Sequence, residues 1–491
     1  MKLKFDITAQ EYTIVKAVLE QTLGSSCDVW VYGSRAKNRA DFNSDLDLAV
    51  DCQDKIPAKI LAGLHASFNE AKLAFTVDVV DLNDVEPRFR QIITQQKVPF
   101  PLSGMAPKLR FPGFDGEWEE KRLGEVASFS KGKGISKDNI SENGNLECIR
   151  YGQLYTDYAE TIRKVKSRTN IPANELVLSE SNDIIIPASG ETQIDISKAS
   201  CVLAKGVALG GDINIIKTKH DGVFLSYYLN SEKRYDIARL SQGISVVHLY
   251  ADQLKQLNLY LPSIPEQQKI AGFLTSVDTR IEQLGRKKAL WEQYKKGMMQ
   301  KLFSREIRFR DDQGNDFPDW EEKKVADIFH ITRGNVLAVK QMTQSPQNSS
   351  IYPVYSSQTK NNGLIGYYSE CLYENAITWT TDGANAGEVK YRKGKFYCTN
   401  VCGVLISDDG YANQCISEML NKITRKYVSY VGNPKLMNNV MALIKINSPS
   451  VPEQQKIAGF LSAIDRKIDH INTQLEQART FKKGLLQQMF V

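Results

Sequence analysis

Long apolar runs are missing from this 491-residue sequence: no uninterrupted stretch reaches the roughly 18 residues of a membrane-spanning helix. Charged residues also break up the N-terminal segment, so this segment does not have the pattern of a secretory signal. Hydrophobic residues make up 42% and charged residues 24% of the chain, values typical of a globular protein. We therefore expect a cytoplasmic protein that makes no contact with a membrane.

Cysteine pairs at metal-binding spacing are missing as well. The chain has no CxxC motif, and Cys398 and Cys402, which lie close together, have no second ligand pair at zinc-site spacing. We therefore expect reduced thiols rather than a zinc site or disulfides. The eight cysteines are Cys27, Cys52, Cys148, Cys201, Cys371, Cys398, Cys402 and Cys415.

The chain also lacks a strong charge of one sign. Its net charge is +6, and residues 1–104 hold 12 Lys and Arg against 14 Asp and Glu. The basic excess therefore lies in the remainder of the chain. It is compatible with a polyanionic partner but is too small to require one.

What the sequence does contain is an internal repeat. The ten residues PEQQKIAGFL occur at 265–274 and again, identically, at 452–461, an offset of 187. The same offset aligns GMMQKLF (297–303) with GLLQQMF (484–490), whereas the tetrapeptide WEEK, first found at Trp118, recurs with an offset of 202. Constant ends around middles of unequal length indicate two duplicated modules whose interiors have diverged.

The repeated ends predict two long helices. Pro265 and Pro452 suit the first turn of a helix, and apolar residues follow at alternating spacings of four and three, as in a coiled-coil seam. About 38 residues would give a helix of about 57 Å. Two helices of the same register in one chain favour an antiparallel pair with pseudo-two-fold symmetry. The lysines that interrupt the apolar stripe are Lys288, Lys295 and Lys482.

The middles of the two modules, residues 119–262 and 321–448, lack long helical patterns. They contain short β-rich segments such as NDIIIPASG and AITWTTDGANAGEVKY, separated by Gly, Asn and Asp. Each also holds a short amphipathic stretch, LSYYLNSEKRYDIARL in the first and ISEMLNKITRKYVSYV in the second. We therefore expect a compact α+β domain in each middle, and call them the first and the second variable domain.

This arrangement resembles the specificity subunits of type I restriction-modification enzymes, in which two target-recognition domains alternate with two conserved helical regions. The likeness rests on LPSIPEQQKIAGFL and SPSVPEQQKIAGFL, on LRFPGFDGEWEEKRLGEVASF (109–129), and on IRYGQLY and YPVYSSQTKNNGLIGYY. It covers residues 105–491. It implies that each variable domain reads one half of a split target in double-stranded DNA, while the helices fix the spacing of the half-sites. It further implies that methyltransferase and restriction subunits of the same system dock on the chain.

Motifs for the chemistry of such a system are missing here. The sequence has no Walker A motif, no methyltransferase glycine loop and no NPPY-like tetrapeptide, apart from the partial look-alike GNPK at 432–435. The resemblance therefore implies that methylation with S-adenosylmethionine, ATP hydrolysis and DNA cleavage belong to partner chains. It also implies a specificity region that is non-catalytic and needs no cofactor. Candidate base contacts are polar residues of Gly-rich loops: Ser189, Gln193, Asn361, Asn385 and Lys390.

Residues 1–104 are different in kind. Thr8 and Glu11 have the spacing of a capping box before a helix that Gly24 would end. The following segment, VWVYGSRAKNRADFNSDLDLAVD, reads as two apolar strands around a Gly-Ser turn, and FTVDVVDL reads as a third strand. This part of the chain therefore predicts a small α/β domain.

Three carboxylates mark this domain. Asp45 and Asp47 are two residues apart at one strand, so both point to the same face of the sheet, and Asp78 lies on a neighbouring strand. Such a set can hold two Mg²⁺ ions around a triphosphate. Gly33 would let the backbone approach the phosphates, and Ser34 would hydrogen-bond to them.

The spacing of Gly-Ser, ten residues, Asp-x-Asp and a later Asp resembles the polymerase-β-like nucleotidyltransferases, especially their small minimal members. That resemblance implies that Asp45 and Asp47 bind Mg²⁺, that Asp78 is the third metal-binding carboxylate and the base, and that Gly33, Ser34 and Arg35 bind a nucleoside triphosphate. The acceptor stays open, because minimal relatives modify proteins, nucleic acids or small molecules. A fused domain can also keep the motif and serve only as a binding module.

Together these patterns predict an α+β multidomain chain. A small α/β nucleotidyltransferase domain is followed by two α+β target-recognition domains, which alternate with two long helices forming an antiparallel coiled coil. The expected domains are 1–104, 105–262, 263–306, 307–448 and 449–491, with a fusion seam near residues 101–107 and a possible internal start at Met105.

Three classes of function are compatible with this organisation. The leading one is a DNA-recognition subunit with an accessory domain. The second is a Mg²⁺-dependent nucleotidyltransferase that the C-terminal region targets to DNA. The third is a scaffold whose coiled coil recruits partners without reading a DNA sequence.

Overall fold

The computed structural model describes residues 5–23, 27–37, 44–52, 54–100, 106–243, 246–347, 349–358 and 360–490. Gly24 and Met105, named above as a helix end and as the start after the seam, lie outside these residues. The chain divides into two compact units. Unit 1 comprises Met1–Asp278 with Thr480–Val491, and unit 2 comprises Thr279–Arg479.

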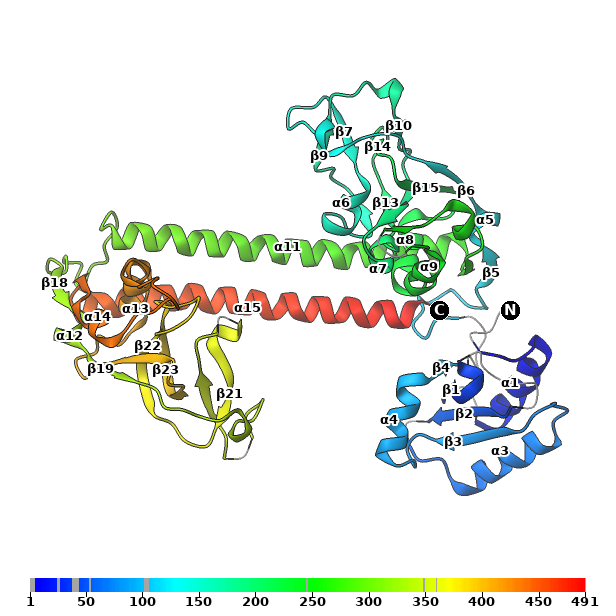
Figure 1. The fold of residues 1–491 in the computed structure, drawn as a ribbon, viewed down its shortest axis with the longest axis horizontal. Coiled ribbons are helices and arrows are strands. Elements are labelled where there is room, and N and C mark those ends of the chain that lie inside the picture. The colour runs from blue at the N-terminus through cyan, green and yellow to red at the C-terminus, as the bar shows by residue number, and fades with distance from the viewer. Residues whose placement is uncertain are drawn as a thin grey trace. The chain divides into compact units, whose positions relative to one another are not determined.

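The N-terminal part of unit 1 is a four-stranded sheet with helices on both faces (Figure 1). The strand order is β3-β2-β1-β4, with β2 and β3 parallel. Helices α1 and α3 cover one face with residues such as Leu19 and Phe68, and α4 covers the other with Ile93. The elements are α1 (Ala9–Leu23), β1 (Asp28–Tyr32), α2 (Gly33–Ala36), β2 (Leu46–Asp51), α3 (Ala58–Glu70), β3 (Val77–Asp81), α4 (Pro87–Gln96) and β4 (Val98–Pro99).

The capping box expected before α1 is present. The backbone N–H of Thr8 donates to Glu11 Oε2 at 2.7 Å, and the N–H of Glu11 donates to Thr8 Oγ1 at 3.2 Å. Two of the helix-end donors are therefore satisfied reciprocally by local sequence alone.

The expectation of reduced thiols is wrong for one pair of cysteines. Cys27 and Cys52 form a disulfide. Strands β1 and β2 are antiparallel, with Asp28 opposite Asp51, so the residues just beyond this pair face each other with their Cα atoms 4.2 Å apart. The sequence could not reveal this pairing because only the strand register brings the two cysteines together. The other six cysteines are free.

The first variable domain is α+β, as expected. Its main sheet has the order β6-β15-β11-β13-β8, and a second sheet has the order β10-β14-β7-β9. Ile184 and Ile186 of β11 belong to the core around α8, whereas Ile185 belongs to a separate core on the opposite face. Burial of both faces explains the continuous apolar run of NDIIIPASG.

The elements of this domain lie between residues 119 and 261. The strands are β5 (Glu119–Arg122), β6 (Ala127–Lys131), β7 (Leu146–Ile149), β8 (Thr161–Ile162), β9 (Ser167–Thr169), β10 (Val177–Leu178), β11 (Asp183–Pro187), β12 (Ser189–Gly190), β13 (Ser200–Val202), β14 (Ala208–Leu209), β15 (Ile213–Thr218), β16 (Val247–His248) and β17 (Asn258–Leu261). The helices are α5 (Leu123–Val126), α6 (Tyr151–Thr156), α7 (Gln193–Ile196), α8 (Gly222–Ser231), α9 (Arg234–Leu240) and α10 (Ala251–Leu254).

Two helix ends complete the core of unit 1. The first turns of α11 (Ile264–Phe303) contribute Ile270 and Leu274, and the last turns of α15 (Val451–Met489) contribute Leu485 and Met489. All four side chains share one core with Trp118. The second module's helix therefore ends inside the core of the first variable domain, antiparallel to the start of α11 (Figure 1).

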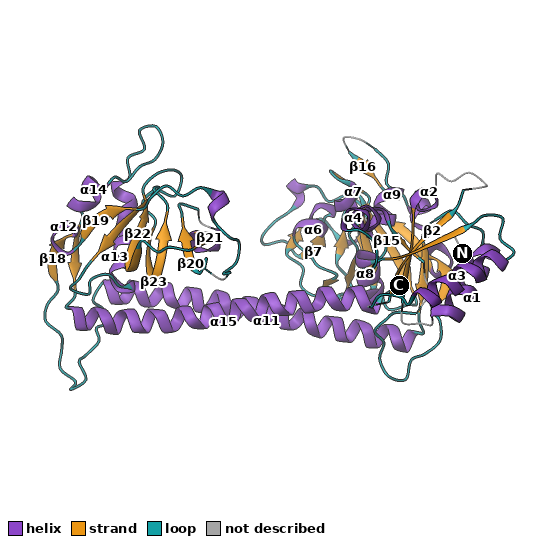
Figure 2. Ribbon diagram, turned by 90° about the horizontal axis from the view of Figure 1, so that it is seen from below, coloured by secondary structure: helices purple, strands orange, loops and turns teal. Residues whose placement is uncertain are grey.

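The second variable domain contains a six-stranded sheet of order β19-β24-β22-β23-β20-β21, with α13 packed on one side (Figure 2). Its strands are β18 (Glu321–Lys324), β19 (His330–Arg333), β20 (Tyr352–Tyr355), β21 (Leu364–Tyr368), β22 (Tyr373–Thr380), β23 (Val389–Cys398), β24 (Cys402–Ile406) and β25 (Lys445–Ser448). Its helices are α12 (Val325–Ile328), α13 (Gln414–Ile423) and α14 (Asn438–Leu443).

The helices in unit 2 pair as the apolar stripe predicts. Leu284 packs with Ile471 and Leu475, whereas Leu302 shares a core with Ile457 and Leu461. Later residues of α11 thus meet earlier residues of α15, which confirms the antiparallel pair. No helix in the described part of the chain is both long and apolar enough to cross a membrane.

Candidate functional sites

The carboxylates predicted in the N-terminal domain lie on one face of its sheet. Parallel strands β2 and β3 place Asp47 opposite Asp78, and β1 places Tyr32 opposite Asp47. The residues on either side of Asp47 are buried against the opposite face, so Asp45 and Asp47 point away from that core. Asp45 accepts a hydrogen bond from the hydroxyl of Thr76.

Gly33 has no room for a side chain. Its φ is +74°, and a Cβ built on it would lie 2.1 Å from Asp47 Oδ2. Any other residue would clash with this carboxylate and would strain the backbone. Gly33 therefore allows the turn that carries Ser34 to lie directly against Asp47.

Negative charge is concentrated at this turn. Burial, followed by the charges of Asp78 and Asp45, raises the pKa of Asp47, while Arg35 opposes the rise. Burial, followed by the charges of Asp47 and Asp78, raises the pKa of Tyr32 to about 12. A bound cation would relieve this repulsion.

Arg35 has a largely structural environment. Its side chain is buried and donates to the backbone oxygens of Asp6 at 2.5 Å and Ser44 at 2.6 Å. The guanidinium also stacks on Phe75, 4.0 Å from the ring centre. These contacts hold the segments around the Gly-Ser turn, and the contact with a triphosphate stays a prediction.

The donor set suits Mg²⁺ in its chemistry, because this ion prefers carboxylate oxygens. Within the residues that the structure describes, however, no three His, Cys, Asp or Glu side chains are gathered closely enough to hold a metal ion. Asp47 and Asp78 are neighbours in register, with Asp45 on the same face, but the three do not close on one point.

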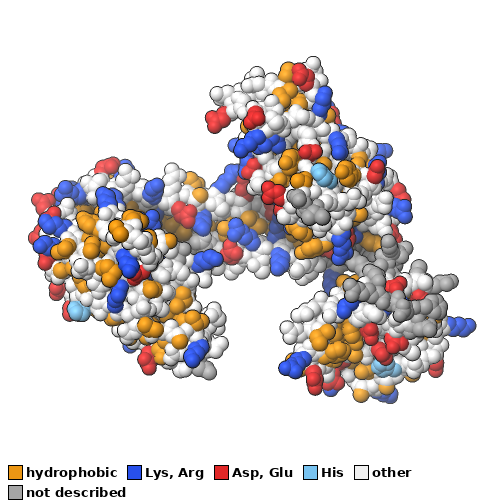
Figure 3. Space-filling view, viewed as in Figure 1, with side chains coloured by type: hydrophobic (Ala, Val, Ile, Leu, Met, Phe, Trp, Pro, Cys, Tyr) orange, Lys and Arg blue, Asp and Glu red, His pale blue; other side chains and the backbone are white. Residues whose placement is uncertain are grey.

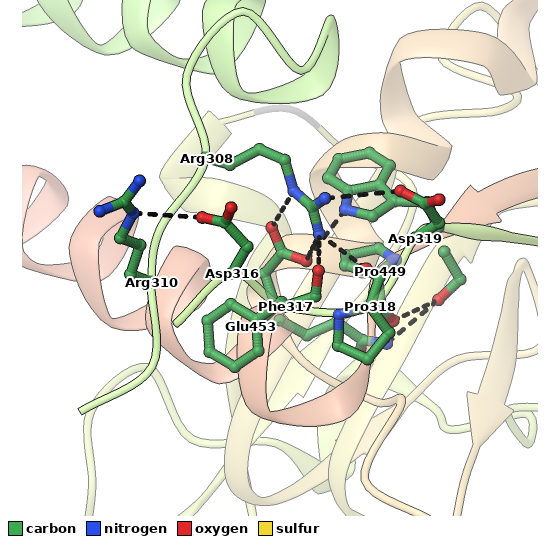
Figure 4. A network of polar contacts seen from close by, with 11 residues as sticks. Arg308, Arg310, Asp316, Phe317, Pro318, Asp319, Pro449 and Glu453 are labelled. Carbon is green, nitrogen blue, oxygen red and sulfur yellow. Dashed lines mark hydrogen bonds and ion pairs between the residues drawn. The ribbon is translucent and has the colours of Figure 1, made fainter. Parts of the chain in front are cut away.

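The repeated PEQQ segment forms an ionic anchor at the start of each long helix. In unit 2, both carboxylate oxygens of Glu453 accept from the guanidinium of Arg308, at 3.1 and 2.8 Å (Figure 4). Trp320 Nε1 donates to the same carboxylate at 3.0 Å, and Arg308 also donates to the carbonyl oxygens of Phe317 and Pro318. The anchor ties the segment before the second variable domain to the first turn of α15.

Unit 1 holds the same anchor. Arg110 donates to the two carboxylate oxygens of Glu266 at 2.7 Å each, and the Glu266 side chain is 1% exposed. Neither arginine is among the site residues predicted from the sequence. The signal was available, because the pair Arg-Phe precedes WEEK in each module, at Arg110 and Arg308.

The first glutamine of each PEQQ segment makes a second tie. Gln267 Oε1 accepts from the backbone N–H of Asp221 at 3.1 Å, and Gln454 Oε1 accepts from Asn413 Nδ2 at 2.7 Å. Asp221 and Asn413 are the N-caps of α8 and α13. Each long helix is thus bound to a helix start in its own variable domain, which explains why Glu and Gln recur together.

Two of the predicted DNA contacts in the second variable domain lie near one loop. Asn385 Nδ2 donates to the carbonyl oxygen of Ser357 at 3.3 Å. Lys390 pairs with Glu388 at 2.7 Å and lines a small polar pocket with residues of the same loop. Asn361 is exposed further along this loop, with a φ of +49°.

The same pocket holds a buried arginine that was not predicted from the sequence. Arg392 is 5% exposed, and it donates to Thr378 Oγ1 at 3.1 Å and to the carbonyl oxygen of Asn362 at 2.8 Å. Its guanidinium lies 3.8 Å from the ring centre of Tyr355. Burial lowers its pKa, and nearby Tyr, Cys and Glu groups oppose this. Alternation along VKYRKG, which puts Lys390 and Arg392 on one face, was the available signal.

The predicted contacts of the first variable domain flank a single turn. Ser189 lies in β12, opposite His248 of β16, and is 6% exposed. Gln193 is exposed at the first position of α7, after the N-cap Thr192. At this turn Gln193 is exposed to solvent, whereas Ser189 is buried.

The charged surface agrees with the small net charge. On the face shown in Figure 3, Lys and Arg side chains alternate with Asp and Glu side chains within each unit, without one large patch of a single sign.

Known families match both parts of the chain. Residues 115–292 and 318–479 match the family described as type I restriction modification DNA specificity domain. Residues 24–100 match the family described as polymerase beta, nucleotidyltransferase.

Individual relatives agree with the first match. A Mycoplasma pneumoniae protein, described as the N-terminus of a type I specificity subunit, is 41% identical over 141 residues, or 28% of this chain and 74% of that protein. Another type I specificity subunit of this organism is 33% identical over 218 residues, 43% of this chain and 85% of the relative. The fold is similar to the crystal structure of a Mycoplasma genitalium type I restriction-modification S subunit. The TM-score is 0.59 at 19% identity, over 79% of this chain and 99% of the other.

Proposed function

The chain belongs to the family of type I restriction modification DNA specificity domains, and we propose that it is the specificity subunit of a restriction-modification system. The observation that carries this proposal is the duplicated anchor. Two unlike variable domains are each tied by an arginine–glutamate pair and a glutamine to a helix that begins with the same ten residues. Constant attachment of exchangeable domains is what the reading of a two-part DNA target requires.

Each variable domain would read one half of the target. Base edges in the major groove are distinguished by bidentate and amide side chains, while phosphate contacts set the register. In the second variable domain, Asn361, Asn385 and Lys390 would supply such groups, with Arg392 holding their loop. In the first variable domain, Gln193 would supply one, with Ser189 supporting the turn.

The chemistry would come from partner chains. Methyltransferase subunits would bring S-adenosylmethionine, and restriction subunits would bring ATP hydrolysis and cleavage, with the long helices as their docking region. Relatives described as specificity subunits of type I restriction enzymes support this division of labour. We place the assembly in the cytoplasm, where its DNA substrate lies.

Methylome sequencing of a host with and without the intact gene tests the proposal. A split, asymmetric methylated motif should disappear on deletion. Exchange of residues 119–262 for another variable domain should then change one half of the motif and leave the other half unchanged. A motif that survives deletion contradicts the proposal, and so does an exchange that alters both halves without matching the donor.

The candidate base contacts can be tested within the same system. Asn385→Ala and Lys390→Ala should relax the second half-site by about 1–3 kcal/mol of discrimination per lost bidentate contact, and leave the first half-site intact. Lys393→Ala is a matched control, because Lys393 is exposed on the same strand. Equal effects of all three substitutions on both half-sites would indicate contact with phosphates or loss of the fold.

A second candidate function is nucleotidyl transfer by the N-terminal domain. It is favoured by the contact between Gly33 and the Asp47 carboxylate, and by the alignment of Asp47 with Asp78. Asp45 and Asp78, which do not close on one point with Asp47 in the structure, would have to draw together with it to hold Mg²⁺, and the ion would neutralise the phosphates of a bound nucleoside triphosphate. Gly33 and Ser34 would bind these phosphates through the backbone and a hydroxyl, and Asp78 would take the proton of the acceptor.

The Asp45→Asn, Asp47→Asn double variant tests this candidate. It should fold normally and lose Mg²⁺ binding, because amides keep the shape but not the charge that binds a hard cation. Label transfer from each nucleoside triphosphate should fall by roughly two orders of magnitude or more. Asp54→Asn, at an exposed aspartate of the same domain, is the control. If the wild type never labels an acceptor, the domain is a binding module instead.

A further inference from the structure

Of the three lysines that interrupt the apolar stripe of the long helices, two are largely covered, where an unpaired charge would be costly. Lys295 lies in α11 and Lys482 lies in α15, and they occupy equivalent places in the repeat, 187 residues apart. Their side chains are 20% and 17% exposed. Such positions require partners, and the structure supplies two acidic groups to each lysine.

In unit 1, Lys482 joins three elements. Its Nζ lies 2.8 Å from Asp278 Oδ1, on the early part of α11, and 3.2 Å from Glu160 Oε2, in the first variable domain. The hydroxyl of Tyr227, on α8 of that domain, donates to Asp278 at 2.5 Å. We call this cluster of side chains around the lysine a joint. The first variable domain contributes two side chains to it, Glu160 and Tyr227.

In unit 2, Lys295 makes the corresponding joint. Its Nζ lies 2.9 Å from Asp465 Oδ1, on the early part of α15, and 2.9 Å from Glu418 Oε1, on α13 of the second variable domain. Gln414 of α13 donates to Asp465 at 2.5 Å. The geometry is the same as in unit 1, with the roles of the two long helices exchanged.

The helix partners are repeat-equivalent, whereas the domain partners are not. Asp278 and Asp465 are also 187 residues apart, so each module donates one lysine and one aspartate, and the pairs form crosswise. Glu160, by contrast, precedes β8, and Glu418 lies within α13. Each of the two unlike domains thus brings a glutamate to the repeat-equivalent lysine of a long helix, but from a different place in its fold.

The charges at each joint are mutually stabilising. Burial alone would lower the pKa of each lysine, but the two acidic partners outweigh it and the pKa is raised, for Lys482 by Glu160 and Asp278 and for Lys295 by Glu418 and Asp465. The ammonium groups therefore stay charged at neutral pH, and loss of either lysine would leave two partly buried carboxylates without a cation.

We propose that Lys295 and Lys482 are positioning residues for DNA recognition, each fixing one variable domain on the long helices through a side chain supplied by the other module. The ion pair with the aspartate (the helix arm) sets the register of the helix pair. The ion pair with the glutamate (the domain arm) sets the position of the variable domain on the helices. The spacing between the half-sites then depends on both joints. This inference rests on the proposed function as a specificity subunit.

The test uses the full chain with its methyltransferase subunits, and DNA that carries the two half-sites found by methylome sequencing. Lys482→Met and Lys295→Met should each lower the ratio of methylation at the native spacer to methylation at spacers one base pair longer or shorter, by about tenfold. The half-site sequences should stay the same. Glu160→Gln should lower the ratio as well, because it removes the domain arm and keeps the helix arm.

Matched controls lie next to the two lysines. Lys296 and Lys483 are exposed and are also 187 residues apart, so Lys296→Met and Lys483→Met should leave the ratio unchanged. Lys482→Arg should restore most of the selectivity that Lys482→Met loses. Equal ratios in the joint variants and the controls would overturn the proposal.

Hydrogen exchange on the full chain without DNA provides an independent readout. In Lys482→Met, exchange around residues 157–162 should rise at least tenfold over the Lys483→Met control, and in Lys295→Met the same should hold for α13. No rise would overturn the joint itself. If the wild type methylates no two-part motif, the proposed function fails, while this measurement still decides whether the lysines hold the domains.

Discussion

The two modules carry the same anchor in different surroundings. Glu266 and Glu453 both accept two hydrogen bonds from an arginine, and both are 1% exposed. In the second module Trp320 adds a third hydrogen bond to Glu453. In the first module the indole N–H of Trp118 is buried without a partner among the described residues, and its ring packs against Phe224.

The difference shows that the ionic anchor and the apolar core around it contribute separately to the stability of each module. In unit 1, Trp118 joins an aromatic cluster in which Phe490 contacts it at a ring-centre distance of 6.4 Å. In unit 2, the equivalent helix end contributes Phe303, which is half-buried. Duplication preserved the ionic contact, whereas each variable domain shaped its own packing around the tryptophan.

Replacement of the phenylalanine at the end of each long helix should give the largest difference in stability between the two modules. Phe490→Ala should cost about 4 kcal/mol, because it leaves a cavity in a closed aromatic cluster, and Phe303→Ala should cost about 2 kcal/mol. Hydrogen exchange in α8 reports on the first module and in α13 on the second. Equal costs would show that the aromatic cluster adds nothing to the first core.

Loss of the anchor carboxylates should come next. Glu266→Gln should destabilise its module by about 3 kcal/mol and Glu453→Gln by about 2 kcal/mol, because an amide cannot balance a covered guanidinium. The side chain of Arg110 is 16% exposed and that of Arg308 is 25% exposed, so water relieves the second module more. Glu119→Gln and Glu321→Gln, at the exposed first residue of each variable domain, should leave urea unfolding unchanged. The reverse order of the two losses would contradict this explanation.

A double-mutant cycle isolates the tryptophan contact. The coupling between Trp320→Phe and Glu453→Gln should be about 1 kcal/mol, which is the net value of one hydrogen bond. The coupling between Trp118→Phe and Glu266→Gln should be near zero, because the Trp118 indole makes no bond to the carboxylate. A similar coupling in both modules would mean that Trp118 reaches Glu266 in solution.

The smallest expected difference concerns pH. Gln267 Nε2 lies 2.9 Å from Nδ1 of His220, whereas the corresponding Gln454 meets Asn413, which does not titrate. Burial lowers the pKa of His220 below its usual 6.5, Gln267 opposes this, and Lys121 adds to it. The stability that His220 contributes is therefore present above pH 6.5 and is lost as the pH falls through the lowered value.

Hydrogen exchange in α8, corrected for intrinsic rates, should accordingly become faster as the pH falls from 8 to 5. Exchange in α13 should change less. The His220→Gln variant should remove the difference between the modules. A difference that persists in this variant would assign the pH effect to another group.

Local patterns in the sequence were sufficient to predict much of the structure of this protein. The Thr8–Glu11 cap depends on a spacing of three residues, and the apolar stripe from Ile270 to Leu302 depends on the helical period, so both could be predicted. The antiparallel helix pair followed because two copies of one stripe can bury each other. The carboxylates Asp45 and Asp47 share a face because side chains alternate along a strand.

Tertiary structure decided the contacts between distant segments. Strand register alone brings Cys27 to Cys52, and it alone places Asp47 opposite Asp78. Lys482, one of the lysines that interrupt the apolar stripe, is paired with a glutamate that lies 322 residues away. A sequence states which groups need a partner, because burial and charge follow from local pattern, but the partner itself is set by the packing of the whole chain.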